Sequence, residues 1–186
     1  KSKKLLLTEA IWTRYMPSRK IIDDIIARGE IGEVTSLTAN LGYELSQIKR
    51  IWDPALAGGA LLDVGVYLVN FARMVFGEDM TSVSSYAVFK DGVDMIDSIV
   101  MTFEGGKTAT MQCNVNAVLN RTGCIFGTKG YLEITNINNP EEIKVYNEEY
   151  QAVRTYAVPE QITGYEYEVE ACVRAIESGS LECPQM

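Results

Sequence analysis

The sequence predicts an α+β domain in which helices pack on one face of a mostly antiparallel open sheet. Two observations carry this prediction. Residues 81–158 show the period-two alternation of apolar and polar side chains that is typical of strands, and helical patterns precede and follow that block. With 186 residues, the chain has the length of one domain and can bury a substantial core.

The first elements are expected to be a strand, a helix and a second strand. Residues 5–12 are mostly apolar, which predicts a short buried strand that leads into a turn. A helix is expected from Pro17 to Arg28, because proline suits the first turn, isoleucines form one apolar stripe and Gly29 provides a stop. Residues 37–43 alternate apolar and polar side chains, which indicates a half-buried strand.

A second helix is expected to begin at Gly58-Gly59 and to end near Phe76, with Gly77 as its stop. Nearly every face of this segment is apolar, so we expect it to be buried. No stretch of the chain approaches the ~20 apolar residues that a membrane-spanning helix needs, so no membrane association is expected.

The central block is expected to consist of strands. Two alternating segments joined by Gly105-Gly106 predict a hairpin. Further strands are expected near residues 83–89, 124–127, 131–135, 142–146 and 153–158. A last helix, from about Tyr165 to Ser178, is expected to bury one apolar stripe before Gly179 ends it. That stripe consists of Val169, Cys172, Val173 and Ile176.

Charge and residue usage exclude several classes of function. The chain carries 17 Lys and Arg against 25 Asp and Glu, a net charge of −8, which argues against nucleic acid and membrane surfaces as partners. It has no histidine and its 4 cysteines form no CxxC pair, so neither a zinc site nor a Cys-His nucleophile is expected. The thiols fit a reducing compartment, and we expect a cytoplasmic protein.

The chain carries no fingerprint of nucleotide binding. No two of its glycines lie two residues apart, so the G-x-G of dinucleotide-binding folds is absent. Residues 127–130, Gly-Thr-Lys-Gly, lie between two expected strands, which favours a turn over a phosphate loop.

Three polar residues of the second helix are candidates for chemistry. Asp63, Tyr67 and Asn70 are four and seven residues apart, so they share one face of an otherwise apolar helix. The phenol of Tyr67 could donate a proton to a carbonyl oxygen or remove one from an alcohol. A capping aspartate and a core tyrosine with a satisfied hydroxyl explain the same spacing, and spacing alone favours that structural role.

A second group of candidates lies in the segments that lead into the first two helices. It consists of Trp12, Arg14, Tyr15, Arg50 and Trp52. Tryptophan and arginine in loops are suitable walls for a ring-shaped ligand, and arginine can anchor an anion. Buried tryptophans with arginine stems packed over them fit the pattern equally well.

Five short motifs are informative when their order and spacing are taken together: Glu9 to Arg14, Gly29 to Val34, Arg50 to Pro54, Gly58 to Tyr67 and Gly127 to Tyr131. Together they resemble the C-terminal domain of the glucose-fructose oxidoreductase, inositol dehydrogenase and rhizopine-catabolism (Gfo/Idh/MocA) family. The resemblance is strongest to its dimeric dihydrodiol dehydrogenase branch.

The resemblance implies a division of the full-length protein. A Rossmann domain that binds NAD or NADP is expected outside this chain, and the family's closing helix is expected after Met186. Residues 1–9 would be the last strand of the cofactor domain, and residues 10–186 would form the substrate-binding and oligomerisation domain. The chain by itself is then expected to bind no cofactor and to be inactive.

The resemblance also implies roles for particular residues. Asp63 and Tyr67 would form a catalytic pair in which Tyr67, together with a lysine outside this chain, exchanges the substrate's hydroxyl proton. Trp12, Arg14 and Trp52 would contact the substrate, a sugar, a cyclic polyol or a dihydrodiol that reacts at a CH-OH group. Related enzymes pair through the sheet, and the uncharged outer alternation of the central hairpin also favours a homodimer.

Two departures from the family pattern leave the substrate open. Ala57 stands where a third glycine is common, and Leu68 stands where proline is common. A non-catalytic sugar-binding or dimerisation module with the same fold is the alternative function.

Overall fold

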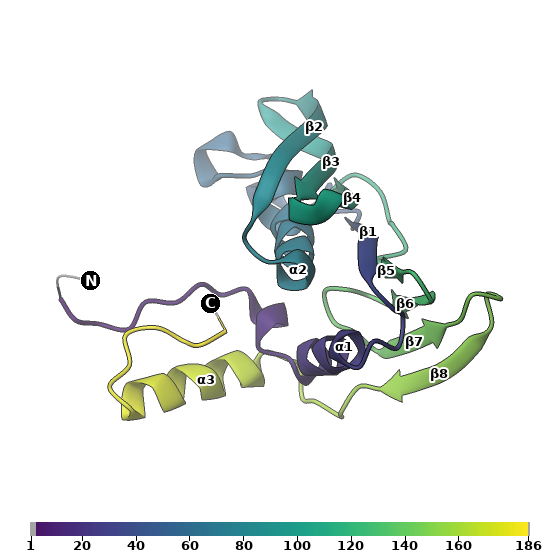
Figure 1. Ribbon diagram of the computed structural model, residues 1–186. Helices are drawn as coiled ribbons and strands as arrows, with labels where there is room; N and C mark the ends of the chain where they lie inside the picture. Colours follow the sequence, from purple (N-terminus) through teal and green to yellow (C-terminus); the bar gives the residue numbers. More distant parts are fainter. Residues whose placement is uncertain (1–2, 186) are drawn as a thin grey trace.

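A curved sheet of eight strands is the framework of the protein in this computed structural model, which describes residues 3–185 (Figure 1). The strands are β1 (Val34–Gly42), β2 (Met80–Lys90), β3 (Val93–Phe103), β4 (Lys107–Asn114), β5 (Gly123–Gly127), β6 (Gly130–Ile134), β7 (Glu142–Tyr146) and β8 (Ala152–Ala157). Their order in the sheet is β2-β3-β4-β1-β5-β6-β7-β8. β1 runs parallel to β4, and the other neighbours are antiparallel. The predicted α+β class with a mostly antiparallel sheet is confirmed.

The predicted hairpin in the centre of the sequence is also confirmed. Gly105 and Gly106 have φ angles of 74° and 76° in the turn that joins β3 to β4, a region that side chains disfavour. Across the two strands Ile99 pairs with Met111 and Met101 pairs with Ala109. All four of these side chains are buried, so this alternation faces the core.

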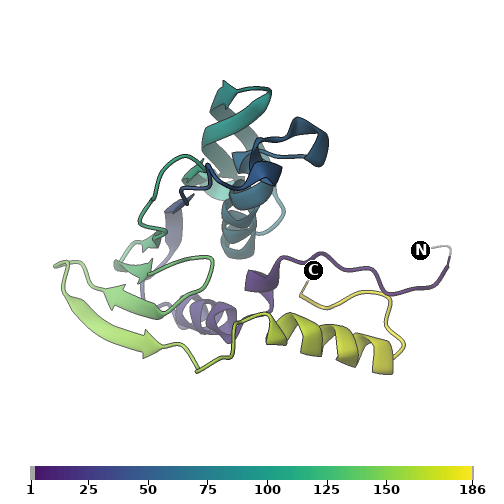
Figure 2. The ribbon, with the colours of Figure 1, turned by 180° about the vertical axis from the view of Figure 1, so that it is seen from behind.

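Two helices, α1 (Pro17–Ala27) and α2 (Val66–Phe76), pack against the sheet (Figures 1 and 2). The first predicted helix is confirmed: a proline occupies its first turn, and Gly29 follows its end with a φ of 66°. Ile25 of α1 and Leu68 of α2 have no exposed surface. Burying one such side chain stabilises the fold by about 1.5–3 kcal/mol.

The second helix is confirmed, but its start and its burial differ from the prediction. Residues Leu61–Gly65 form a π-helical turn before the α-helix begins. Gly77 ends the helix with a φ of 83°. The expectation of complete burial is wrong, because Leu61 and Leu62 are 40% and 62% exposed.

By length and composition, the helical stretch Pro54–Phe76 is apolar enough to cross a membrane, which corrects the expectation that no such stretch exists. Core helices share this property. In this protein the stretch buries Leu68, Phe71 and Ala72 against the sheet.

Residues 5–12 form no strand, so this prediction is wrong. Leu7 is exposed, and its N–H donates to Leu181 O at 3.1 Å. A strand needs a neighbouring edge for its backbone groups, whereas this segment runs beside the C-terminal residues (Figure 1). The assignment of residues 1–9 to the sheet of another domain stays a prediction, and residues 1 and 2 lie outside the described residues.

The last predicted helix is present as α3 (Glu166–Glu177), but it buries a different side from the expected one. The expected stripe is exposed, by 60% at Val169 and by 65% at Ile176. Small side chains are buried instead, which lets neighbouring groups approach the helix closely. The residues of this small cluster are Ala171, Ala175, Tyr15 and Cys183. α3 lies with both terminal segments to the side of the sheet (Figures 1 and 2).

Two glycine-containing turns pack against each other at the start of β1. Lys129 N donates to Ile31 O at 2.9 Å. A Cβ on Gly127 would lie 2.1 Å from Ile31 O, so glycine is required for this approach. The interpretation of residues 127–130 as a turn is confirmed.

Two carboxyl groups meet beneath the start of the second helix. Asp97 on β3 is only 5% exposed, and Cys113 Sγ donates to its Oδ2 at 3.4 Å. Burial raises the pKa of Asp97 to about 6, and a hydrogen bond with Asp94 adds to the rise. Asp94 Oδ2 in turn accepts from Leu61 N at 2.6 Å. The buried carboxyl is thus linked through its neighbour to the point at which the helix begins.

We expect Asp97→Asn to remove a pH-dependent cost of folding. Because the pKa of Asp97 is raised in the folded protein, the folded state keeps a proton between about pH 4 and about pH 6 that the unfolded state releases. The stability of the wild type should therefore fall relative to the variant as the pH rises through this window, by up to about 2 kcal/mol. Urea unfolding near pH ~4.5 and pH ~7 measures this difference, and equal differences at the two pH values would contradict the expectation.

Candidate active site

Tyr67 lies half-buried in the first turn of α2, directly after the π-helical turn. Burial raises the pKa of its hydroxyl, and the neighbouring Tyr165 and Asp63 raise it further. Trp12 opposes the rise without reversing it. The hydroxyl is therefore protonated at neutral pH and can donate a hydrogen bond or a proton to an oxygen placed against it.

Trp12 and Tyr165 form an aromatic wall beside Tyr67. Their ring centroids are 4.3 Å apart and their planes are inclined by 27°. Gly164 permits this contact, because its φ is 96° and a Cβ there would lie 2.6 Å from the Trp12 ring. Trp12 is buried, and its indole N–H lies close enough to the Tyr67 hydroxyl to oppose the rise of the tyrosine's pKa. Its Nε1 has no hydrogen bond of regular geometry among residues 3–185, so this donor can orient the Tyr67 oxygen or turn to an acceptor on a ligand.

Glu166 holds the loop that carries Tyr165. Its carboxylate accepts hydrogen bonds of 2.6, 3.1 and 2.7 Å from the backbone N–H groups of Ile162, Thr163 and Gly164. Partial desolvation alone would raise the pKa of Glu166, but these N–H groups outweigh it and lower the pKa to about 2. The loop is therefore fixed by a carboxylate at the start of α3.

Asp63 lies one helical turn before Tyr67 and pairs with an arginine. Arg50 Nη2 donates to Asp63 Oδ1 at 2.6 Å. No hydrogen bond joins Asp63 to Tyr67 in the part of the chain that the structure describes, and the influence of Asp63 on the Tyr67 pKa is through its charge. The spacing of the sequence therefore brings the two side chains near each other, while Arg50 supplies the direct partner of the carboxylate.

Arg14 and Asn70 meet on the other side of the tyrosine. Arg14 Nε donates to Asn70 Oδ1 at 2.9 Å, and Asn70 Nδ2 donates to Val66 O at 2.9 Å. Burial lowers the pKa of Arg14, and the nearby Arg73 lowers it further. Asn70, the third polar residue of the helix face, is thus hydrogen-bonded to Arg14, one of the two loop arginines.

Trp52 and Tyr15 have other surroundings. Trp52 Nε1 donates to Leu45 O at 2.9 Å, and the Lys90 ammonium lies 5.8 Å from the centre of its ring. Tyr15 packs in the small cluster under α3, and its hydroxyl lies 2.8 Å from Thr8 Oγ1. Tyr15 therefore has a packing role, and substrate contact by Trp52 stays a prediction.

The sequence did not identify Tyr165 as a residue of the candidate site; it marked only the expected start of the last helix. A local signal was available: Thr163 and Glu166 are separated by two residues and follow the T-x-x-E capping pattern, which places the intervening Tyr165 at the helix terminus beside Gly164. Its contact with Trp12 has no such signal, because the two residues are far apart in the chain.

Within residues 3–185 no group of three or more His, Cys, Asp or Glu side chains is placed to hold a metal ion. The polar groups of this region are a phenol, an indole N–H and the Arg50–Asp63 ion pair.

Comparison with known families gives a match over more than half of the chain. A sequence model of the GFO/IDH/MocA C-terminal domain matches residues 20–133. The chain belongs to this family. The matched region includes the Tyr67 helix and strands β1 to β5, whereas β7 and β8 follow it.

Curated relatives carry the name trans-1,2-dihydrobenzene-1,2-diol dehydrogenase. The protein from Mus musculus is 34% identical over 152 residues, which is 80% of this chain and 45% of the mouse protein. The protein from Xenopus tropicalis is 32% identical over 193 residues, which is 98% of this chain and 57% of the frog protein. The chain thus spans about half the length of the curated relatives that it matches.

Solved structures share the fold at low sequence identity. The 3-ketoreductase KijD10 from Actinomadura kijaniata, solved with NADP and TDP-benzene, superposes with a TM-score of 0.88 at 22% identity, over 96% of this chain and 56% of that protein. An aldose-aldose oxidoreductase from Caulobacter crescentus superposes with a TM-score of 0.80 at 20% identity, over 93% of this chain and 54% of that protein.

We expect Gly164→Ala to push the Trp12 and Tyr165 rings of the aromatic wall apart. The new Cβ would meet the Trp12 ring, whereas at Gly105, which also has a positive φ, a Cβ meets nothing within 4 Å. Gly105→Ala is therefore a matched control for the backbone cost alone. Gly164→Ala should destabilise the protein by about 1–3 kcal/mol more than the control and should change the tryptophan emission. Urea unfolding followed by fluorescence measures both effects. An equal loss of unfolding free energy in the two variants would show that the contact between Gly164 and the Trp12 ring is loose.

Proposed function

We propose that this chain is the substrate-side domain of an NAD(P)-dependent oxidoreductase that acts on a CH-OH group of a sugar, a cyclic polyol or a dihydrodiol. The observation that carries the proposal is a protonated, half-buried phenol, Tyr67, beside a wall made by Trp12 and Tyr165. Such a site suits a small ring that carries a reacting oxygen. The names of the relatives, diol dehydrogenases and a ketoreductase, support the same alcohol-carbonyl chemistry.

Tyr67 is the proposed proton-exchanging residue. Oxidation of a CH-OH carbon to a carbonyl releases the hydroxyl proton, and reduction of the carbonyl requires one. With a raised pKa, the Tyr67 hydroxyl holds its proton in this chain and is ready to donate it to a carbonyl oxygen. Trp12 Nε1, which lies beside the Tyr67 hydroxyl, would orient that hydroxyl or donate a second hydrogen bond to the substrate oxygen.

Asp63 and Arg14 are proposed to support the site. The charge of Asp63 raises the Tyr67 pKa, and the ion pair with Arg50 fixes its carboxylate. Arg14 is held by Asn70 and leaves further N–H groups for a substrate hydroxyl or an anionic substituent.

The described residues do not fit a dinucleotide. A phosphate cradle of the Rossmann type needs a strand, a glycine turn and a helix whose N-terminus approaches the phosphates. The sequence has no G-x-G turn, and residues 3–185 form no parallel β-α-β unit of that kind. We therefore propose that NAD or NADP binds to another part of the full-length protein, and that this chain by itself is inactive. The relatives are about twice as long as the chain, which leaves room for such a part.

We expect Tyr67→Phe to lower the turnover of the full-length protein by roughly 10²-fold or more, the usual effect of removing a positioned acid or base. The melting temperature should change little, because the ring is kept. Tyr86→Phe, at an exposed position of β2, is the matched control and should leave turnover unchanged. Steady-state rates and thermal melts on the same samples test this. Wild-type rates in a folded Tyr67→Phe protein would contradict the proposal and favour a non-catalytic binding module.

We also propose that the protein forms a homodimer through the outer face of the sheet. The outward alternation of the central strands carries no charge. It consists of Ser36, Thr38, Asn40, Ser98, Val100, Thr102, Thr108, Thr110 and Gln112. Uncharged sheet faces of this kind are usually covered. In a two-fold contact each substitution acts twice, once from each subunit.

We expect the double substitution Thr102→Lys and Thr110→Lys to dissociate this dimer, because it places like charges on both sides of the contact. Sedimentation equilibrium of wild type and variant measures the change. The double substitution Val153→Lys and Thr155→Lys, on β8 at the edge of the sheet farthest from β3, is the control and should not dissociate it. A wild type that remains monomeric at high concentration would rule the interface out.

A further inference from the structure

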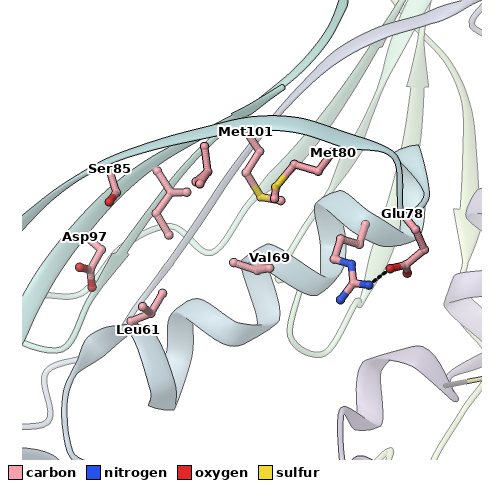
Figure 3. A pocket seen from close by; sticks show the side chains of 10 residues that line it. Leu61, Val69, Glu78, Met80, Ser85, Asp97 and Met101 are labelled. Atoms are coloured by element: carbon pink, nitrogen blue, oxygen red, sulfur yellow. Dashed lines mark ion pairs between the residues drawn. The ribbon is translucent and has the colours of Figure 1, made fainter. Parts of the chain in front are cut away.

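A cavity of about 420 Å³ lies between α2 and the strands β2 and β3. Its α2 residues are Val69 and Arg73, and it shares no lining residue with the Tyr67 site described above. Its walls are largely apolar: Val69 lies opposite Met101 and Met80 (Figure 3), and Ile99 also lines the space. The volume suits a small organic molecule.

The polar groups of the cavity lie at its two ends (Figure 3). At one end Arg73 pairs with Glu78, so the charge of this arginine is already neutralised. At the other end lie Asp97 and Ser85. Asp97 pairs with Ala87 across β3 and β2, so Ser85 is its diagonal neighbour on the same face of the sheet.

The carboxyl end of the cavity lacks a cation. Among residues 3–185 no lysine or arginine forms an ion pair with Asp97 or with its neighbour Asp94, and the chain has no histidine. Asp97 is nearly inaccessible, and a buried carboxylate without a cation is costly. The cavity is therefore complementary to a positive charge at this end and to an apolar body along its length.

We propose that this cavity binds a small organic amine. The ammonium group would donate to the Asp97 carboxylate and to Ser85 Oγ, and a ring or short chain would lie against Val69, Ile99 and Met101. This inference does not rest on the proposed oxidoreductase activity, because none of these residues contacts the Tyr67 site.

Titration of the 186-residue chain with three matched compounds tests the proposal. The probes are 3-phenylpropylamine, 3-phenylpropanol and 3-phenylpropionate, which share one apolar body and differ in charge. Calorimetry should give the tightest binding for the amine and the weakest for the carboxylate. Asp97→Asn should lower the affinity for the amine by about 10-fold or more, which is the scale of one charge-assisted hydrogen bond. The same substitution should change the affinity for the alcohol little.

Methionine methyl NMR locates the bound amine. Met80 and Met101 line the cavity, whereas Met16 lies against Gly164 beside the aromatic wall. Binding of the amine should shift the methyl resonances of Met80 and Met101 and leave the methyl resonance of Met16 unchanged. Asp24→Asn, an exposed carboxylate of α1, is the control for unspecific attraction of a cation and should not change the affinity.

Three outcomes would overturn the proposal. The first is equal affinity for the amine and the carboxylate, or affinity weaker than about 1 mM for both. The second is an unchanged amine affinity in Asp97→Asn. The third is a shift of the Met80 and Met101 resonances with protein concentration alone, which would identify a second copy of the chain as the occupant of the cavity.

Discussion

The contact between Asp94 and the start of the second helix is the constraint on which both the proposed substrate site and the proposed amine-binding cavity depend. Asp94 Oδ2 accepts from Leu61 N, and a Cβ on Gly59 would lie 2.1 Å from Asp94 Oδ1. Gly59 also has a φ of 117°, which only glycine adopts without strain. Because the carboxylate occupies the space of a side chain, the helix must begin at this point, and the π-helical turn Leu61–Gly65 follows directly from it.

The position at which this helix begins determines which of its side chains face the Tyr67 site and which face the cavity over β3. On one side Asp63 reaches Arg50, and Tyr67 stands beside Trp12. On another side Val69 closes the cavity above β3, where Asp97 lies next to Asp94. The helix therefore separates a site with a neutral proton donor from a cavity with an uncompensated carboxyl.

The aromatic wall depends on a second part of the chain. α3 and the terminal segments form their own small cluster, and the loop before α3 brings Tyr165 onto Trp12. Glu166 rigidifies this loop through three backbone hydrogen bonds. The proposed substrate site is consequently assembled from the start of the chain, its centre and its end, and its aromatic wall is complete only when α3 is docked.

The sequence by itself determined the sheet and the two helices that cover it, and it made Tyr67 a candidate for proton transfer. Alternation around Gly105-Gly106 and the isoleucine stripe of α1 are local patterns, and local patterns report strand and helix periods directly. The position of Tyr67 four residues after Asp63, together with the family motifs around it, identified the candidate catalytic face.

Tertiary structure alone decided which surfaces meet. Residues 5–12 have the composition of a strand but find no strand edge, and the apolar stripe of α3 is exposed because the chain covers the alanine side instead. Trp52 and Trp12 have different neighbours, Leu45 for Trp52 and Tyr165 for Trp12. These contacts depend on the path that the chain takes between distant residues. A sequence pattern states that a face is apolar, but the partner that covers the face is set by contacts between residues far apart in the chain, which no local period encodes.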